Sequence, residues 1–300
     1  MQTTSQLLMV RPANFGFNTQ TAGNNRFQTV LDDKDIQAKA LLEFDGLVQL
    51  LRDNDIDVTV LQDEPIPNTP DAIFPNNWIS FHPGRTICLY PMFAANRRQE
   101  RKPQFIEALK NKFGISKTID FTRHENNNQF LEGTGSMVLD RRFNIAYACR
   151  SARTDIKVLD EFCRLMKFTP VLFDACDENG NAIYHTNVMM CVAEQYVVIC
   201  NESIPDAAEK KNVISAIKMS GKKLIPISFE QLRHFAGNML QVQNAKGELF
   251  LIMSAQAYRS LSSRQVKELE KYNSLLYAQL NTIEATGGGS ARCMIAEVFL

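Results

Sequence analysis

Hydrophobic and polar positions along the chain form one pattern that returns five times. Each block has a small polar residue, an apolar strand, a short polar turn and a second apolar strand. Four of the blocks read NNWISFHPGRTICLYPM, GSMVLDRRFNIAYACRS, TNVMMCVAEQYVVICNES and GNMLQVQNAKGELFLIMSAQ. Turns such as HPGR and NAKG carry the glycine and proline that are typical of β-hairpins. The pattern therefore predicts a repeated hairpin.

Each of these blocks is followed by a stretch with helical periodicity, at residues 99–113, 154–167, 206–219 and 255–272. A short apolar run then predicts a further strand, as GISKTI, TPVLF or KKLIPI, with SLLYAQL a weaker candidate after the last helix. The fifth block is split between the ends of the chain. RCMIAEVFL ends the sequence, and QLLMVRP begins it, followed by a predicted helix near 30–53 and the strand IDVTVL. If these ends pair, every unit is strand, strand, helix, strand.

The equivalent first-strand positions are 51 to 59 residues apart: Asn77, Ser136, Asn187, Asn238 and Cys293. A period of this size is typical of propellers and other repeat folds. We therefore expect an α/β protein with a single domain over residues 1–300, a five-bladed pseudo-symmetric α/β propeller of ββαβ units closed by pairing of the terminal strands. An α/β sandwich whose hairpins merely look alike is the alternative. The ring is favoured because reactive residue types stand where first strands begin, and in a ring these points converge on one axis.

The composition of the chain argues against several classes of protein. The chain has 300 residues, of which 45% are hydrophobic and 22% charged, as in globular proteins with a sizeable core. Lys plus Arg and Asp plus Glu number 33 each, so there is no basic excess for nucleic acid or for a membrane surface. No apolar run approaches the roughly 20 residues of a membrane span, and the start lacks a signal-peptide pattern. Seven scattered cysteines without a C-x-x-C pair argue against disulfides or zinc and predict a cytoplasmic protein.

Cys293 is the first candidate for chemistry, in the string GGGSARCMIAEVFL. Glycines 287–289 allow close approach to a ligand, and backbone N–H groups together with Arg292 predict an electropositive surrounding that favours the thiolate. A buried cysteine of a terminal strand is the plain alternative.

His185 and Glu132 are the candidates for a base and its partner. His185, in NAIYHTNVMM, shares the repeat position of Cys293, so a thiol and an imidazole would meet as a nucleophile–base pair. Glu132, in FLEGTGSMVLD, also leads into a strand and would orient the imidazole as the third member of a triad. A structural histidine and a turn carboxylate that caps local N–H groups are the alternatives.

The set FPNNW, LEGTGS, HTN and GGGSARCM, in this order, resembles the arginine deiminase and amidinotransferase superfamily. The opening VRPANFGFN and the length of the chain are most similar to its citrulline-hydrolase branch, the bacterial citrulline-utilisation proteins. The resemblance implies a five-bladed α/β propeller with the site on its axis. It also implies that Cys293 is the nucleophile, His185 the general acid/base and Glu132 its carboxylate partner.

The resemblance extends to substrate-binding residues. Arg153, in CRSART, matches an arginine that binds the substrate α-carboxylate, and Asn14 and Phe15 stand on the access loop as side walls. Arg292, beside the nucleophile, is a second candidate for a carboxylate. Relatives that act on guanidines carry Asp where this chain has Asn77 and Asn187, and their EGGD is EGTG here.

Asn77 and Asn187 indicate which substrate class the site prefers. A guanidinium has only N–H donors and suits carboxylates, whereas a neutral ureido group also exposes a carbonyl acceptor. We therefore expect hydrolysis of a small-molecule ureido amino acid by a covalent Cys-His-Glu mechanism without cofactor or metal. The leading substrate is citrulline, which would give ornithine, ammonia and carbon dioxide. The alternatives are arginine or a methylated arginine as substrate, or a non-catalytic propeller that binds an amino acid. The oligomeric state stays open.

Overall fold

Five small sheets make up the framework of the computed structural model, which describes residues 1–300. In each sheet the first strand pairs antiparallel with the second, and the second pairs parallel with the third. In spatial order the sheets are β15 (Ala296–Glu297), β1 (Gln6–Arg11) and β2 (Asp57–Gln62); β3 (Ile79–His82), β4 (Thr86–Leu89) and β5 (Lys117–Asp120); β6 (Met137–Asp140), β7 (Ile145–Cys149) and β8 (Thr169–Phe173); β9 (Met190–Val192), β10 (Tyr196–Ile199) and β11 (Lys223–Pro226); and β12 (Leu240–Gln243), β13 (Leu249–Ser254) and β14 (Ser274–Ala278).

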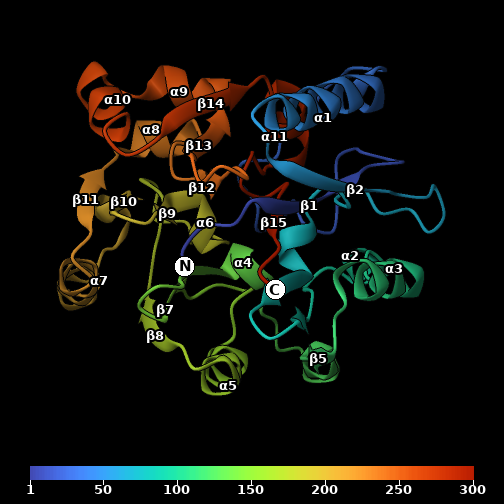
Figure 1. Cartoon of the computed structure of the whole chain (residues 1–300), viewed down its shortest axis with the longest axis horizontal. Coiled ribbons are helices and arrows are strands. Elements are labelled where there is room, and N and C mark those ends of the chain that lie inside the picture. The colour runs from blue at the N-terminus through green and yellow to red at the C-terminus, as the bar shows by residue number, and fades with distance from the viewer.

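The five sheets correspond to the five predicted units. A helix connects the second strand of each unit to the third, as a parallel connection requires. These connections hold α1 (Ile36–Asp53), α2 (Ala95–Arg98) with α3 (Pro103–Phe113), α5 (Ile156–Met166), α7 (Ala207–Met219), and α9 (Ala255–Ser260) with α10 (Ser263–Leu269). The long helices lie at the periphery and the strands nearer the middle (Figure 1).

Two predicted helices are broken in the structure. The stretch 99–113 becomes helical only from Pro103, because Lys102 before it is extended (ψ 129°) and proline favours the first turn of a helix. The stretch 255–272 divides at the extended Leu261, and Ser262 then starts α10 with a capping box to Gln265. In both places a local start signal interrupts the longer apolar periodicity.

The two ends of the chain lie in one sheet. β1 pairs with β15 through Leu7 opposite Glu297 and Leu8 opposite Ala296, so the predicted pairing of the terminal strands is present. The sheets themselves remain five separate three-stranded units, arranged about the middle of the molecule (Figure 1). The fold is thus a mixed α/β fold with the predicted repeat, and closure into a five-bladed ring stays a prediction.

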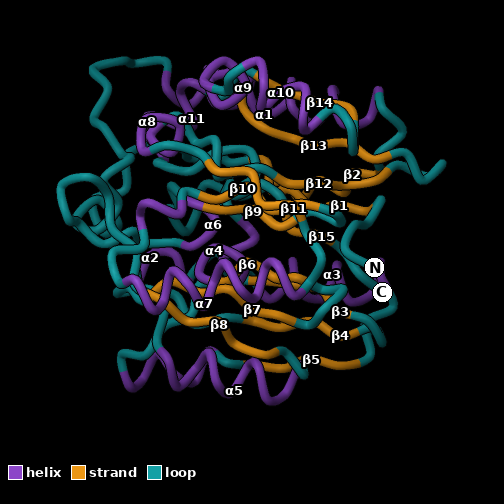
Figure 2. Tube along the Cα trace, turned by 90° about the vertical axis from the view of Figure 1, so that its left-hand side faces the viewer, coloured by secondary structure: helices purple, strands orange, loops and turns teal.

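Short helical turns precede the first strands and link neighbouring units. They are η1 (Pro75–Asn77), α4 (Gly133–Ser136) and α6 (Thr186–Met189), with non-regular turns before β12 and β15. Thr134 Oγ1 donates to Asn76 O (3.4 Å), and Thr186 Oγ1 donates to Ser136 O (2.6 Å). α4 and α6 lie at the end of the sheets away from the chain termini (Figure 2). The repeat thereby gathers the residues before five strands into one buried polar region.

Apolar side chains fill the space between each sheet and its helix. The largest cluster surrounds β9, β10 and β13, and others lie beneath α1, α5 and α3. The connecting helix α11 (Asn281–Gly287) and the short α8 (Phe229–Arg233) complete the structure on the side of the linking turns. None of the helices is long and apolar enough to cross a membrane.

Candidate active site

A small cavity lies among the linking turns. Its volume is about 10 Å³, which is close to the space that one water molecule needs. The residues that line it are Asn25, Asp71, Phe74, Asn77, Arg97, Arg153, Tyr184, His185, Gly287, Gly289 and Cys293. Four of them, Asn77, Arg153, His185 and Cys293, were predicted from the sequence.

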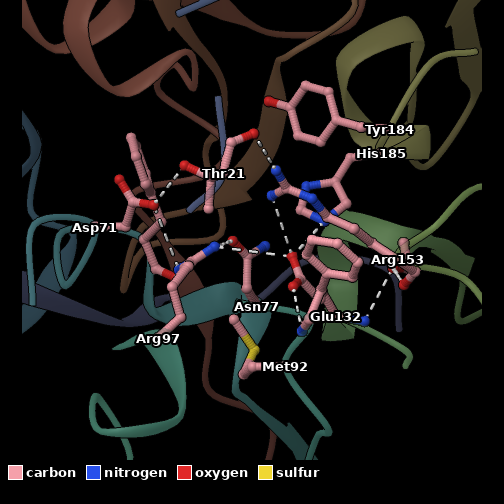
Figure 3. Close-up of polar contacts among 12 residues, drawn as sticks. Thr21, Asp71, Asn77, Met92, Arg97, Glu132, Arg153, Tyr184 and His185 are labelled. Atoms are coloured by element: carbon pink, nitrogen blue, oxygen red, sulfur yellow. Dashed lines mark hydrogen bonds and ion pairs between the residues drawn. The ribbon is translucent and has the colours of Figure 1, made fainter. Parts of the chain in front are cut away.

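His185 and Glu132 form a buried pair at this cavity (Figure 3). His185 Nε2 lies 2.9 Å from Glu132 Oε2, and the other carboxylate oxygen accepts from Phe93 N at 2.9 Å. His185 Nδ1 takes part in no hydrogen bond, so it is the ring nitrogen that is free to exchange a proton. The structure thus brings together the two residues that the sequence paired, and the role of Glu132 in orienting the imidazole stays a prediction.

Burial and charge set the protonation states of this pair. Burial lowers the pKa of His185 to about 4, although the bond to Glu132 opposes the shift. Burial acts to raise the pKa of Glu132, but Arg153 and the hydrogen bond with His185 outweigh it and hold that pKa far below its ordinary value. At neutral pH the pair is therefore a neutral imidazole on an ionised carboxylate.

Cys293 is buried on the turn before β15. Its N–H donates to Ser290 O at 2.9 Å, and its Sγ lies 3.2 Å from Asn238 Nδ2 and 3.5 Å from Asn187 Nδ2. Burial raises the pKa of the Cys293 thiol above its ordinary value. The sequence predicted an electropositive surrounding that favours the thiolate, whereas burial outweighs the neighbouring groups, so the raised pKa keeps the thiol protonated at neutral pH.

Arg292 lies apart from the cavity. Its guanidinium donates to Ile295 O (2.8 Å) and Glu297 Oε2 (2.8 Å), which lie toward β15. The role of a substrate-carboxylate contact that the sequence suggested for Arg292 therefore has no support from its position. Asn14 and Phe15 also lie outside the cavity lining, and Asn14 Nδ2 donates to Pro65 O at 2.7 Å instead.

Asn77 and Asn187 occupy different places. Asn77 lines the cavity, but Arg97 Nη1 donates to its Oδ1 at 2.8 Å and its own Nδ2 donates to Asn76 Oδ1 at 3.0 Å. Asn187 does not line the cavity and approaches it only through the contact with Cys293. Of the two asparagines that the sequence related to the substrate, only Asn77 therefore lines the cavity.

Gly135 explains why the EGTG motif needs a glycine at its end. A Cβ there would stand 2.4 Å from Asn77 Nδ2 and 2.8 Å from the His185 ring. Any side chain would displace one of these two groups. Where the family motif has a carboxylate, this chain has a glycine, and the backbone of α4 therefore packs directly against the side chains of Asn77 and His185.

Arg97 and Asp71 are site residues that the sequence analysis missed (Figure 3). Arg97, on α2, is buried and held by both oxygens of Glu100 at 2.8 and 3.0 Å. Asp71 Oδ2 lies 3.7 Å from Arg97 Nε and accepts from Asn18 Nδ2 at 2.7 Å. Its Oδ1 has no partner, and burial raises the pKa of Asp71. Neither residue stands at a repeat position, so no sequence signal pointed to them.

Arg153 joins the cavity to the N-terminal strap, by which we mean residues 18–29. Its Nε donates to Asn24 Oδ1 (3.0 Å), its Nη2 to Thr21 O (3.2 Å), and its Nη1 to Glu132 Oε2 (3.4 Å). The guanidinium also stacks over the Tyr184 ring, with 4.7 Å to the ring centroid. Arg153 is thus a buried cation whose outer donors face oxygen atoms of the strap (Figure 3).

Solved structures with a similar fold were found by comparison. The N-terminal domain of ArgZ, as a variant covalently bound to a reaction intermediate, has a TM-score of 0.74 and 20% identity, with 98% of this chain and 97% of that chain covered. AgrE with ornithine and NAD⁺ has a TM-score of 0.73 and 20% identity over 98% of this chain and 40% of that chain. ArgZ is described as an arginine dihydrolase from the ornithine-ammonia cycle in cyanobacteria.

A dimethylarginine dimethylaminohydrolase adduct with S-methyl-L-thiocitrulline is similar as well. Its TM-score is 0.67 at 14% identity, with 98% of this chain and 99% of that chain covered. No curated protein matches the sequence. The sequence model described as N,N dimethylarginine dimethylhydrolase, eukaryotic, matches residues 11–300. This chain therefore belongs to the dimethylarginine dimethylhydrolase family, within the arginine deiminase and amidinotransferase superfamily.

Proposed function

We propose that this chain is a cysteine-dependent hydrolase that breaks a C–N bond in the guanidino group of arginine or a methylated arginine. One observation carries the proposal: Cys293 and His185 line the same small cavity as Asp71, a buried carboxylate with an unpartnered oxygen. A nucleophile, a base and a site for a cation are thus within one small volume. The names of the family and of ArgZ, which refer to arginine or dimethylarginine, support this substrate class.

The charges around the cavity favour a cationic substrate. Two guanidinium groups face three carboxylates in one buried network, which consists of Arg97, Arg153, Asp71, Glu100 and Glu132. With all of them ionised, the network carries one excess negative charge. Burial raises the pKa of Glu100 to about 7, so near neutral pH this charge is either neutralised by a proton on Glu100 or paired with a bound cation. A buried charge without a partner is costly, so a ligand with one net positive charge is preferred. Arginine and its methylated forms carry that charge at neutral pH.

The two ends of such a substrate have separate partners. Arg153 already directs its donors at Asn24 Oδ1 and Thr21 O, so a substrate α-carboxylate would replace these two oxygens on the guanidinium. Asp71 Oδ1 is the acceptor left for a substrate N–H group. Arg97 is less available, because Glu100 already occupies its Nε and Nη2.

The chemistry follows from the protonation states. Cys293 Sγ gives its proton to His185 Nδ1 as it attacks the central carbon of the bound guanidinium, whose positive charge favours the thiolate. Because the pKa of His185 is low, the protonated imidazole readily gives its Nδ1 proton to the departing amine. Glu132 stabilises the imidazolium until then. Water, which gives a proton to the same imidazole, then attacks the carbon that is bound to Cys293 Sγ. The C–S bond breaks, and the imidazolium returns the proton to the Cys293 thiolate. Arginine and water thereby give citrulline and ammonia, and methylated arginines give the corresponding methylamine.

Citrulline is a second candidate substrate, and the amides favour it. Asn77, Asn187 and Asn238 surround the reacting residues, and no free carboxylate other than Asp71 faces the cavity. An amide presents both a donor and an acceptor, which matches a neutral ureido group. In this case the same attack by Cys293 would yield ornithine, ammonia and carbon dioxide.

A substrate panel separates the two candidates. Purified protein is given arginine, mono- and dimethylarginine, and citrulline, while ammonia, methylamines, citrulline and ornithine are followed. We expect amine release from the guanidino substrates, and loss of at least about a thousandfold in Cys293→Ser. Ornithine formed from citrulline with no turnover of guanidino compounds would replace the first candidate with the second. If no substrate gives Cys293-dependent turnover, both are wrong.

A further inference from the structure

An asparagine outside the predicted triad touches the reacting sulfur. Asn238 Nδ2 lies 3.2 Å from Cys293 Sγ, and the Asn238 side chain has no exposed surface. We propose that Asn238 is a further catalytic residue, whose amide N–H stabilises the Cys293 thiolate as it forms and as it departs from the covalent intermediate. This inference rests on the proposed role of Cys293 as nucleophile, but not on the identity of the substrate.

The hydrogen bonds of Asn238 fix which end of its amide faces the sulfur. Its Oδ1 accepts from Arg292 N at 3.1 Å, and a backbone N–H only donates. Its Nδ2 also donates to Asn187 O at 2.8 Å, and a backbone carbonyl only accepts. Both outer partners therefore require the same orientation, so the nitrogen, with its remaining hydrogen, faces Cys293.

Other groups near Cys293 are less suited to this task. Arg292, the nearest cation in the sequence, turns its guanidinium to Glu297 and Ile295. Asn187 places its Nδ2 3.5 Å from Sγ and its Oδ1 3.7 Å from Sγ, so its amide is not directed by nitrogen alone. No cationic side chain donates a hydrogen bond to Cys293 Sγ, so direct contacts to a buried thiolate come from neutral donors, and Asn238 is the nearest side-chain donor.

Asn238 also connects three units of the repeat. It stands on the turn before β12 and bonds to the turns that carry Asn187 and Arg292. A purely structural role is thus the competing explanation, and it makes a different prediction. Loss of a structural link lowers stability, whereas loss of the sulfur contact also raises the pKa of the Cys293 thiol.

Two variants separate these explanations without any substrate. Asn238→Asp keeps an oxygen for Arg292 N but places a carboxylate at the sulfur, and Asn238→Ala removes the donor altogether. The thiolate of Cys293 is titrated by its ultraviolet absorbance against Cys293→Ser, and its alkylation by iodoacetamide is followed by peptide mass spectrometry. We expect the thiol pKa to rise by about one unit or more, and alkylation at neutral pH to slow about tenfold.

Asn244→Ala is the matched control. Asn244 is a buried asparagine that directly follows β12, and its side chain bonds within its own hairpin to Lys246 N and Glu248. This variant loses a structural asparagine yet should leave the thiol titration unchanged. If folded Asn238→Asp and Asn238→Ala titrate as the unmutated chain does, Asn238 is structural only and the proposal is overturned.

A measurement on the unmutated chain does not depend on how the variants fold. With nitrogen-15 in asparagine, the side-chain amide signal of Asn238 should move with the titration of Cys293 and stay still in Cys293→Ser. A signal that ignores this titration contradicts the proposal. Because none of these measurements needs turnover, they also distinguish failure of Asn238 from failure of the proposed substrate class.

Discussion

Cys293, His185 and Glu132 share one buried environment, and it acts on each of them differently. The imidazole is kept neutral, the carboxylate is kept ionised by its cationic neighbours, and the thiol is kept protonated. With the thiol and the imidazole both neutral, we expect the substrate to favour formation of the thiolate. The sequence placed these three residues together, because each one stands at the start of a repeated strand. It could not indicate Asp71 or Arg97, whose approach to the site depends on contacts far along the chain.

The low pKa of His185 predicts a loss of stability in acid. In the unfolded chain the imidazole takes up a proton below its ordinary value of 6.5, whereas in the folded chain it does so only near 4. The contribution of His185 to the free energy of unfolding is therefore greatest above pH 6.5 and is lost as the pH falls toward 4. Between pH 7 and pH 5 the loss from this group is about 2 kcal/mol. Urea unfolding at both pH values should show it in the unmutated chain.

His185→Gln serves as the comparison, because glutamine is neutral at every pH of interest. The variant should lose about 2 kcal/mol less on going from pH 7 to pH 5 than the unmutated chain loses. Equal losses in the two proteins would mean that the histidine is protonated in the fold and that its buried, neutral state is wrong.

At the level of elements, the N-terminal strap closes the site. Asn18 bonds to Asp71, Thr21 and Asn24 bond to Arg153, and Thr29 N donates to Ala285 O at 2.7 Å. The strap holds the groups that the proposed substrate needs, so we expect it to move when an amino acid binds in a cavity of one-water size. Strands and most helices could be predicted from periodicity, but this strap has no periodic pattern. Its position follows from buried charges on the units beneath it.

Weakening the strap should expose it to a protease. Asn24→Ala removes the side-chain oxygen from Arg153, and a hydrogen bond to a charged group contributes about 1.5–3 kcal/mol. Arg26 is an exposed residue of the same strap and a site for trypsin. We expect native-state cleavage after Arg26 to become about tenfold faster or more. Asn14→Ala, which removes a bond to Pro65 O instead, should leave that cleavage rate unchanged, and an unchanged rate in Asn24→Ala would argue against the closed strap.

At the scale of the whole molecule, the repeat converts five weak units into one structure. Each sheet has only three strands, the minimum for independent stability, and the linking turns bond one unit to the next. The chain ends meet in the sheet of β1 and β15, so the unit split between them is held by residues almost 300 positions apart. The repeat length and the split unit were readable from the sequence, because spacing and apolar pattern are local. The exact bonds between units were not, because they join different side chains at each step.

This linkage predicts one cooperative unfolding transition, and the only tryptophan can report it. Trp78 is buried between β3 and the terminal strands, in a different cluster from Ile199 on β10. Ile199→Ala leaves a cavity in the largest cluster and should lower the free energy of unfolding by about 2–5 kcal/mol. If the units unfold together, Trp78 fluorescence and far-ultraviolet circular dichroism shift to the same lower urea midpoint. Met219→Ala, at an exposed position of α7, is the control and should shift neither. A fluorescence midpoint that stays in place while the circular dichroism transition moves would mean that the sheets unfold independently, and the linking turns would then position the site without stabilising the molecule as a whole.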